Sequence, residues 1–268
     1  MSRPNKTPLL KSFGKAPASE REIALVGGCG RWRVPEETPV AFIYNGRNYA
    51  VMLATPADIF DFAVGFTLAE RIAENLGEID SVEAHYGDEA VDIRLSIAPA
   101  ALERFDLRQQ RRNLVGRAGC GVCGVENADV FFEKLPLVGD EKKSVSQSAM
   151  LNAIRALPSH QPLNALTRSV HAAAWAGDDG RILLAREDVG RHNALDKLAG
   201  ALICADENAA GGFLVMSSRC SFEIVEKAAR AGMRAILSVS APTDFAIRKA
   251  EEANIALYAL AGEQIAAF

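Results

Sequence analysis

Gly212-Phe-Leu-Val-Met-Ser217 is an apolar run of about the length of one β-strand. Amphipathic segments and further apolar runs alternate after it, in the order Ser221–Ala231, Ala235–Ser240, Thr243–Ala253 and Ile255–Leu260. Buried strands read as short continuous apolar runs, and their alternation with helices is typical of βαβ units. The stretch 212–260 therefore predicts an α/β layered domain with a mixed, largely parallel sheet, whose later strands are parallel.

The residues before this stretch extend the alternation toward the N-terminus. A helix is predicted over Ser146–Ala156, and the apolar run Leu166–Trp175 follows it. A strand is then predicted over Arg181–Arg186 and a helix over Arg191–Cys204. Further upstream, the pair Asn45-Gly46 is a strong signal for a tight hairpin between two β-prone runs, Pro39–Asn45 and Tyr49–Ala54. We next expect a helix over Ile59–Ala73, capped by Thr55-Pro-Ala-Asp58. Two strands, Ser81–Tyr86 and Ala90–Ile97, and a second helix, Pro99–Leu114, should follow.

These patterns divide the 268 residues into three regions. Residues 1–22 are polar, contain proline and have no periodicity, which predicts a flexible arm. Residues 23–138 form a smaller N-terminal α+β region, and residues 139–268 form the α/β domain. The charged linker Gly139–Lys143 marks the boundary between them.

Composition excludes two classes of partner. A net charge of −4 argues against nucleic acid, which requires a broad basic face. No apolar run reaches the roughly 18 residues that span a bilayer, and the first residues lack a secretion signal. The sequence therefore predicts a cytoplasmic protein that binds neither nucleic acid nor membrane.

The stretch Arg117-Ala-Gly-Cys-Gly-Val-Cys-Gly124 contains the most reactive chemistry of the chain. Cys120 and Cys123 are spaced closely enough to share a metal, form a disulfide or pass a sulfur atom between them. Arginines upstream, Arg117 among them, favour the thiolate and lower the pKa of a nearby cysteine. We expect nucleophilic thiols in a glycine-rich loop.

Two other interpretations of this pair stay open. A structural zinc site needs four ligands, which His171 and His192 could complete. A thioredoxin-like redox pair is the second, although no strand directly precedes the cysteines. Of the remaining cysteines, Cys204 is expected to pack on an apolar helix face, whereas Cys220 and Cys29 have no expected role.

Three segments follow predicted strands and open the next helices: Glu187–Asn193, Ser217–Ser221 and Ser240–Asp244. Ligands of α/β sheets gather at such strand ends, where helix N-termini receive phosphates. Arg191 and Arg219 suit phosphate oxygens, although either arginine could simply be solvated. His192 could cap a helix or bind a ligand, and His171 could lie in the core or in the pocket. Glu187 and Asp188 could charge a helix N-terminus or bind guanine or ribose.

The combined segments resemble the FdhD family of formate dehydrogenase accessory sulfurtransferases over roughly residues 22–260. The matching segments include Arg111-Arg-Asn-Leu-Val-Gly-Arg-Ala-Gly-Cys-Gly-Val-Cys-Gly124, Val170-His-Ala-Ala-Ala174, Glu187-Asp-Val-Gly-Arg-His-Asn-Ala-Leu-Asp-Lys197 and Ser240-Ala-Pro-Thr243. The resemblance implies a homodimer with a fold related to the cytidine deaminases. Deaminase chemistry itself is not expected, because Ala172 and Ala173 follow His171 where a His-x-Glu motif is needed.

The resemblance also implies an activity. Cys120, with Cys123 as its partner, would accept sulfur as a persulfide from a cysteine desulfurase and pass it to bis(molybdopterin guanine dinucleotide), before this cofactor enters the formate dehydrogenase apoenzyme. The chain would then be a sulfurtransferase without a metal, and GDP would mimic the cofactor. A non-catalytic chaperone for the molybdenum cofactor is the alternative.

The cofactor-binding residues that the resemblance implies are Arg117, Arg191, His192, Ser218, Arg219 and the segment Leu260, Ala261, Gly262, Glu263, Gln264 and Ile265. This last segment departs from the family pattern, because it lacks basic residues and has Leu260 where phenylalanine is common. Arg71 and Thr167-Arg-Ser169 replace glycine-containing positions of the family.

Overall fold

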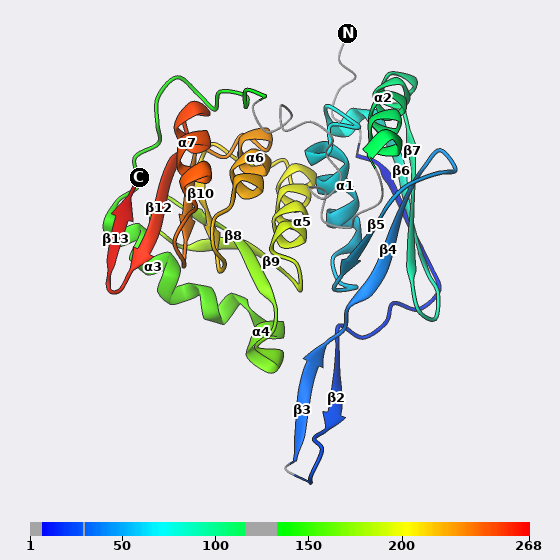
Figure 1. Ribbon diagram of the computed structural model, residues 1–268, viewed down its shortest axis with the longest axis horizontal. Helices are drawn as coiled ribbons and strands as arrows, with labels where there is room; N and C mark the ends of the chain where they lie inside the picture. Colours follow the sequence, from blue (N-terminus) through cyan, green and yellow to red (C-terminus); the bar gives the residue numbers. More distant parts are fainter. Residues whose placement is uncertain (1–6, 29, 116–132) are drawn as a thin grey trace.

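A computed structural model of the chain describes residues 7–28, 30–115 and 133–268 (Figure 1). It has a five-stranded sheet in the N-terminal half, a six-stranded sheet in the C-terminal half, helices packed between and around them, and a two-stranded ribbon. The six-stranded sheet has the strand order β13 (Gln264–Ala267), β12 (Ala256–Ala261), β11 (Ala235–Ser238), β10 (Gly212–Met216), β8 (His171–Gly177) and β9 (Ile182–Asp188). Mixed α/β architecture is therefore confirmed.

The expectation of a largely parallel sheet is only partly right. Strands β10, β11 and β12 pair in parallel, as predicted for the later strands. The β10–β8, β8–β9 and β12–β13 pairs are antiparallel. Strand β8 lies between β9 and β10 and runs against both, while β13 folds back from β12 across a turn at Gly262, whose φ is +64°. Strands β9, β10, β11 and β12 nevertheless share one direction, so their carboxyl ends meet at one edge. A relationship of this domain to the cytidine deaminases stays a prediction.

Helices cover both faces of the six-stranded sheet. Trp175, Leu214 and Leu257 pack in a core with α5 (Arg191–Cys204), α6 (Phe222–Arg230) and α7 (Asp244–Glu252). Side chains that alternate with them, such as Val215 and Leu237, pack with α3 (Gln147–Ala156) on the other face. The short helix α4 (Pro162–Thr167) precedes β8. Leu135 and Val138, which the sequence places in the first region, belong to the core of this second half.

The five-stranded sheet has the order β1 (Leu9–Phe13), β6 (Ile79–Tyr86), β7 (Val91–Ile97), β4 (Thr38–Tyr44) and β5 (Arg47–Ala54). The Asn45-Gly46 hairpin is confirmed, and both residues have the positive φ that such a turn requires. Helices α1 (Ile59–Ala69) and α2 (Pro99–Val115) accompany this sheet, and a short 3-10 helix, η1 (Leu76–Glu78), leads into β6.

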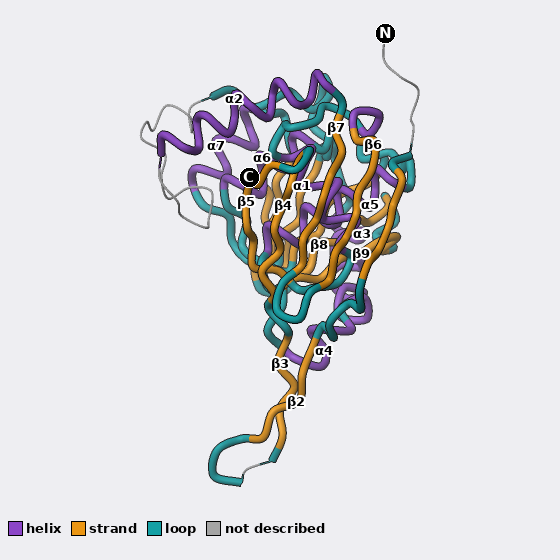
Figure 2. The backbone as a smooth tube through the Cα atoms, turned by 90° about the vertical axis from the view of Figure 1, so that its right-hand side faces the viewer, coloured by secondary structure: helices purple, strands orange, loops and turns teal. Residues whose placement is uncertain are grey.

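The prediction of a flexible arm over residues 1–22 is wrong for residues 7–22, which the structure describes. Strand β1 pairs in parallel with β6, so Leu9 lies opposite Ser81 and Phe13 opposite His85. A second strand, β2 (Glu20–Ala24), pairs with β3 (Arg31–Pro35) in a ribbon that projects from the body (Figure 2). Ion pairs between Arg33 and Glu20 and between Arg31 and Glu22 join the ribbon's two strands. Side chains that are mostly exposed carry no burial pattern, which is why the sequence did not reveal these strands.

The start and end of α1 also differ from the prediction. Asp58 is the residue before the helix and has a left-handed φ of +53°, and its side chain makes no capping hydrogen bond to the first turn. The helix ends at Ala69 rather than Ala73, because Arg71 adopts a left-handed φ of +57° and turns the chain. Thr55, expected as the cap, instead bonds to the C-terminal half.

Helix α1 packs across α5 through two glycines and joins the two halves. A Cβ atom on Gly65 would lie 1.7 Å from the backbone oxygen of Asp196, and one on Gly200 would lie 2.0 Å from that of Asp61. Only glycine permits so close an approach of two backbones. The two halves therefore share a rigid helix crossing.

Candidate anion-binding edge

The carboxyl ends of β9, β10 and β11 bring the three predicted loop segments together. We call this surface the anion edge and define it by residues 187–193, 217–221 and 240–244. Val239 N donates to Met216 O at 2.9 Å, and Thr243 N donates to Cys220 O at 3.0 Å, which joins the second and third segments. His192 Nε2 lies 3.4 Å from Ser221 Oγ and joins the first segment to the second. The sequence therefore correctly predicted this juxtaposition.

His192 stands in the first turn of α5 and pairs with the first turn of α6. Its Nε2 lies 2.8 Å from Glu223 Oε2. Burial alone would raise the pKa of Glu223, but the hydrogen bond and charge of His192, with Lys227 and Arg191 nearby, outweigh burial and hold that pKa below its ordinary value. Glu223 is thus a structural partner of His192. Because its ring also lies beside Ser221, His192 still belongs to the anion edge.

Two arginines of the edge have side chains without a partner among the described residues. Arg191 Nε is buried and makes no hydrogen bond there. Arg219 is exposed, and its side chain forms no ion pair within the described ranges. Ser218 between the strand and Arg219 is 5% exposed and donates its hydroxyl to Arg219 O at 3.0 Å. A buried, unsatisfied guanidinium nitrogen carries a free-energy cost that an anionic ligand would remove.

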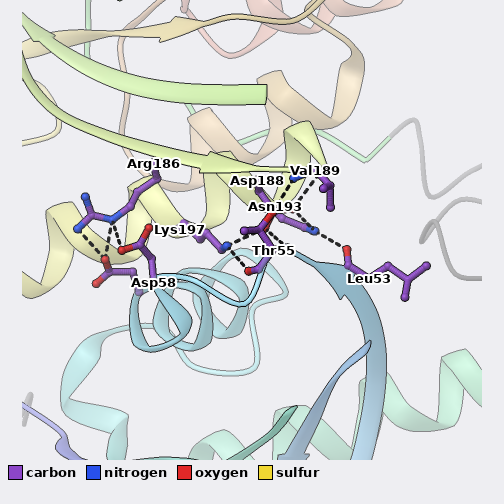
Figure 3. A network of polar contacts seen from close by, with 10 residues as sticks. Leu53, Thr55, Asp58, Arg186, Asp188, Val189, Asn193 and Lys197 are labelled. Carbon is purple, nitrogen blue, oxygen red and sulfur yellow. Dashed lines mark hydrogen bonds and ion pairs between the residues drawn. The ribbon is translucent and has the colours of Figure 1, made fainter. Parts of the chain in front are cut away.

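A buried polar network fixes the start of α5 against the N-terminal half (Figure 3). Asp188 Oδ2 accepts from Lys197 Nζ at 2.6 Å and from Thr55 N at 3.0 Å. Its Oδ1 accepts from Gly190 N at 2.8 Å and from Asn193 Nδ2 at 2.9 Å. Lys197 also donates to Thr55 O at 2.8 Å. Four donors occupy the two oxygens of Asp188, so this carboxylate stabilises the fold. A role of Asp188 in binding guanine or ribose is therefore not supported.

Glu187 has a structural role as well. Its two carboxylate oxygens each accept a backbone N–H at 2.8 Å, from Leu163 and Asn164 in the first turn of α4. Burial raises the pKa of Glu187, and the two backbone hydrogen bonds oppose this shift. Glu187 therefore places its charge at a helix N-terminus, as expected, but the helix is α4 rather than α5.

The predicted C-terminal segment Leu260–Ile265 forms the turn between β12 and β13. Leu260 pairs with Ile265 and Ala261 with Gln264 across the hairpin. The turn follows the carboxyl end of β12, so it lies at the same end of the strands as the anion edge. Its residues 261–264 are exposed. A hollow of about 180 Å³ lies instead at the start of β12, lined by residues such as Lys143, Ala256 and Phe268, and none of the predicted site residues that the structure describes lines it.

Sequence reasoning missed the partners that hold the edge: Thr55, Lys197 and Glu223. The available signal was the charged pair Asp196-Lys197 within an otherwise apolar stretch of α5, because buried charged residues require partners. Arg186 was missed too. It bonds Asp61 at 2.8 Å and lies 3.6 Å from Asp58, which adds a second link between the halves.

Comparison with known proteins identifies the family. The sequence model of the FdhD/NarQ family matches residues 35–266. The chain belongs to the FdhD/NarQ family.

Relatives within the FdhD/NarQ family are similar along most of their length. The sulfur carrier protein FdhD of Bordetella petrii is 45% identical over 225 residues, which cover 84% of this chain and 80% of that protein. The protein of the same name from Agrobacterium fabrum is 43% identical over 231 residues, covering 86% and 84%. A crystal structure described as a formate dehydrogenase accessory protein from Desulfotalea psychrophila has a TM-score of 0.68 at 22% identity, covering 92% of this chain and 95% of that one. It shows the shared fold.

The cysteine motif of this FdhD/NarQ chain, with Cys120, Cys123 and Arg117, lies outside the described residues, as does Cys29. The zinc and redox interpretations of the motif stay predictions. Within the described residues, no three His, Cys, Asp or Glu side chains gather as a metal site. No helix there is long and apolar enough to cross a membrane.

The other two cysteines differ from each other. Cys220 is fully buried, and burial raises the pKa of its thiol to about 12, as suits a residue without a chemical role. Cys204 was expected to be packed, but it is exposed at the end of α5, because the apolar face of this helix ends with Leu202 and Ile203. Partial burial of its thiol and the charge of Asp61 raise the pKa of Cys204.

Proposed function

We propose that this chain is a sulfurtransferase that accepts sulfur on Cys120 and delivers it to the molybdenum cofactor of a formate dehydrogenase. The observation that supports this most is the 45% identity, over 84% of the chain, to a protein named sulfur carrier protein FdhD. The motif Cys120-Gly-Val-Cys123 provides the sulfur chemistry that such a name requires.

The loading step is a thiolate exchange. The Cys120 thiolate attacks the terminal sulfur of a cysteine desulfurase persulfide, a new S–S bond forms on Cys120, and the donor cysteine leaves as a thiolate. In the release step, the Cys123 thiolate attacks the Sγ of Cys120, which forms a disulfide and frees sulfide for the acceptor. A thiol reductant then returns the pair to thiolates, which suits the reducing cytoplasm where we place this reaction.

The anion edge supports the choice of acceptor. Bis(molybdopterin guanine dinucleotide) carries pyrophosphate groups, and arginine forks bind phosphate oxygens through two parallel hydrogen bonds. The buried Nε of Arg191 lacks a partner among the described residues, and Arg219 is exposed beside Ser218. These side chains, with His192, would bind the phosphates. The turn Leu260–Ile265 lies on the same side of the sheet, where it would contact the remainder of the ligand.

Maturation of formate dehydrogenase tests the function. In cells that lack their own copy of this protein, the wild-type chain should restore formate dehydrogenase activity, whereas Cys120→Ala should not. Cys204→Ala is the matched control, because Cys204 is an exposed thiol outside the motif. Full activity with Cys120→Ala would remove the thiol from the mechanism and favour the alternative, a chaperone that binds the cofactor without sulfur transfer.

We also propose a homodimer. Closed two-fold dimers are the commonest oligomers of soluble proteins, and a dimer would bring two anion edges into one particle. Sedimentation equilibrium should give twice the mass of the chain, and a monomer across the working concentration range would contradict the proposal.

A further inference from the structure

We propose that His171 is a further ligand-binding residue of the anion edge, and that its imidazole takes up a proton when a phosphate-bearing ligand binds there. This inference rests on the proposed function, because it concerns the same edge. It adds a residue outside the predicted binding set and a dependence of binding on pH.

The strand register places His171 in a row of side chains at the edge. His171 is the first residue of β8 and lies opposite Asp188, the last residue of β9. On its other side, Ala172 N donates to Ser217 Oγ at 2.8 Å and Ser217 N donates to Ala172 O at 3.0 Å, which brings the end of β10 alongside. His171 therefore lies between the Ser217–Ser221 segment and Asp188.

The alternation of β8 determines which face His171 shares. Ala173 and Trp175 pack in the core with α5 and α6, whereas Ala172 and Ala174 pack on the opposite face with α3. Because side chains alternate along a strand, His171 lies on the same face as Ala173, the face on which α5 begins. The imidazole is thus on the side of the sheet that carries Arg191 and His192.

In this row, the side chain of His171 is the one without a partner in the part of the chain that the structure describes. The oxygens of Asp188 accept from Lys197, Thr55, Gly190 and Asn193, and His192 is paired with Glu223. Among the described residues, no hydrogen bond or ion pair engages the His171 imidazole. Arg191, whose Nε also lacks a partner there, acts on His171 electrostatically. The Arg191 guanidinium and the His171 imidazole, both on this face, could therefore donate hydrogen bonds to an oxyanion such as a phosphate.

The charges around His171 favour its neutral form in the free protein. Burial lowers its pKa first, and the charges of Arg191 and His192 on α5 lower it further, while Asp188 on β9 opposes them. Of the other groups at this edge, Glu223 on α6 is engaged by His192, and Arg219 after β10 is exposed. A phosphate dianion placed between Arg191 and His171 would neutralise the repulsion and favour the imidazolium, so ligand binding would be coupled to proton uptake.

Proton NMR tests this directly, because the chain has only four histidines. The ring resonances of the full-length protein would be assigned with His→Gln variants and followed from pH 5 to 8, with and without saturating GDP. The titration midpoint of His171 should move upward by about one pH unit with GDP, which corresponds to roughly tenfold tighter binding when His171 is protonated. His85, which lies on β6 in the five-stranded sheet and pairs with Glu83, should not move.

The outcomes separate this inference from the proposed function. If GDP shifts His192 but leaves the His171 midpoint unchanged, His171 does not take part and the inference is wrong. If GDP binds nowhere, as judged by all ring resonances and by calorimetry, the assignment of the edge itself fails. His171→Gln should weaken GDP binding increasingly as the pH falls, approaching about tenfold well below the titration midpoint of His171, and much less at pH 8; an equal loss at pH 5 and pH 8 would indicate a structural role only.

Discussion

Lys197 Nζ lies 2.6 Å from Asp188 Oδ2, and both side chains are fully buried. The pair joins three parts of the molecule, since Asp188 ends β9, Lys197 lies in α5, and both bond the backbone of Thr55 after β5. Such a network costs desolvation free energy, and it is stable only because each polar atom has a partner. Because the network fixes the start of α5, where Arg191 and His192 lie, it helps to determine the geometry of the anion edge.

Removing one member of this pair should therefore destabilise the protein strongly. Lys197→Met leaves an uncompensated buried carboxylate, which should lower the free energy of unfolding by about 3–5 kcal/mol. The double variant Lys197→Met with Asp188→Asn should recover part of this loss. Arg248→Ala, which breaks the exposed pair with Asp244, is the control and should change stability by less than about 1 kcal/mol. Urea unfolding measures all three, and a buried pair that costs no more than the exposed one would refute the role we assign to it.

The glycine crossing of α1 and α5 predicts a second stability effect. Gly65→Ala would place a Cβ atom 1.7 Å from the backbone oxygen of Asp196, so the helices must separate. We expect a loss of at least about 1–3 kcal/mol, the usual cost of overpacking. Gly211→Ala meets its nearest atom at 3.3 Å and serves as the control. Thermal unfolding compares them, and equal midpoints for both variants would show that the crossing is not tightly packed.

The His192–Glu223 contact predicts a stability change with pH. The pKa of Glu223 is lower in the folded protein than its ordinary value of 4.5, so its contribution is present above pH 4.5 and is lost as the pH falls through the folded pKa. The difference in unfolding free energy between the wild-type protein and Glu223→Gln should therefore shrink as the solution is acidified below pH 4.5. Urea unfolding at several pH values measures this difference, and a constant difference down to pH 3 would contradict the lowered pKa.

GDP should raise the melting temperature through the anion edge. At a concentration of 100 times its Kd, a ligand stabilises a protein by about 2.7 kcal/mol. Arg219→Ala removes an exposed arginine without disturbing an observed contact, so it should leave the unliganded melting temperature unchanged and reduce the GDP shift by about half or more. Arg155→Ala, at an exposed position of α3, should retain the full shift. Equal shifts in both variants would remove Arg219 from the binding surface.

The sequence predicted the elements with a buried face and missed those without one. The hairpin at Asn45-Gly46, helix α5 and strands β10–β12 follow directly from periodicity and turn chemistry. The ribbon β2–β3 and strand β1 were missed, because a strand that depends on partner strands rather than on a buried face leaves little trace in the order of residues.

The site shows the same division. Arg191, His192, Ser218 and Arg219 could be assigned to one edge, because parallel strands bring their carboxyl ends together. The partners of Asp188 could not be assigned, since Thr55 is 133 residues away in the chain and only the packing of α1 on α5 brings it near. Long-range polar pairing is a property of tertiary structure that local patterns do not encode.

The most direct test of the central claim is the intact mass of the protein after incubation with a cysteine desulfurase and cysteine. We expect the mass to increase by one sulfur atom, with the added sulfur on the peptide that contains Cys120, absent in Cys120→Ala and present in Cys204→Ala. An unmodified mass under conditions in which the desulfurase itself is persulfidated, or sulfur found only on Cys204, would contradict the account.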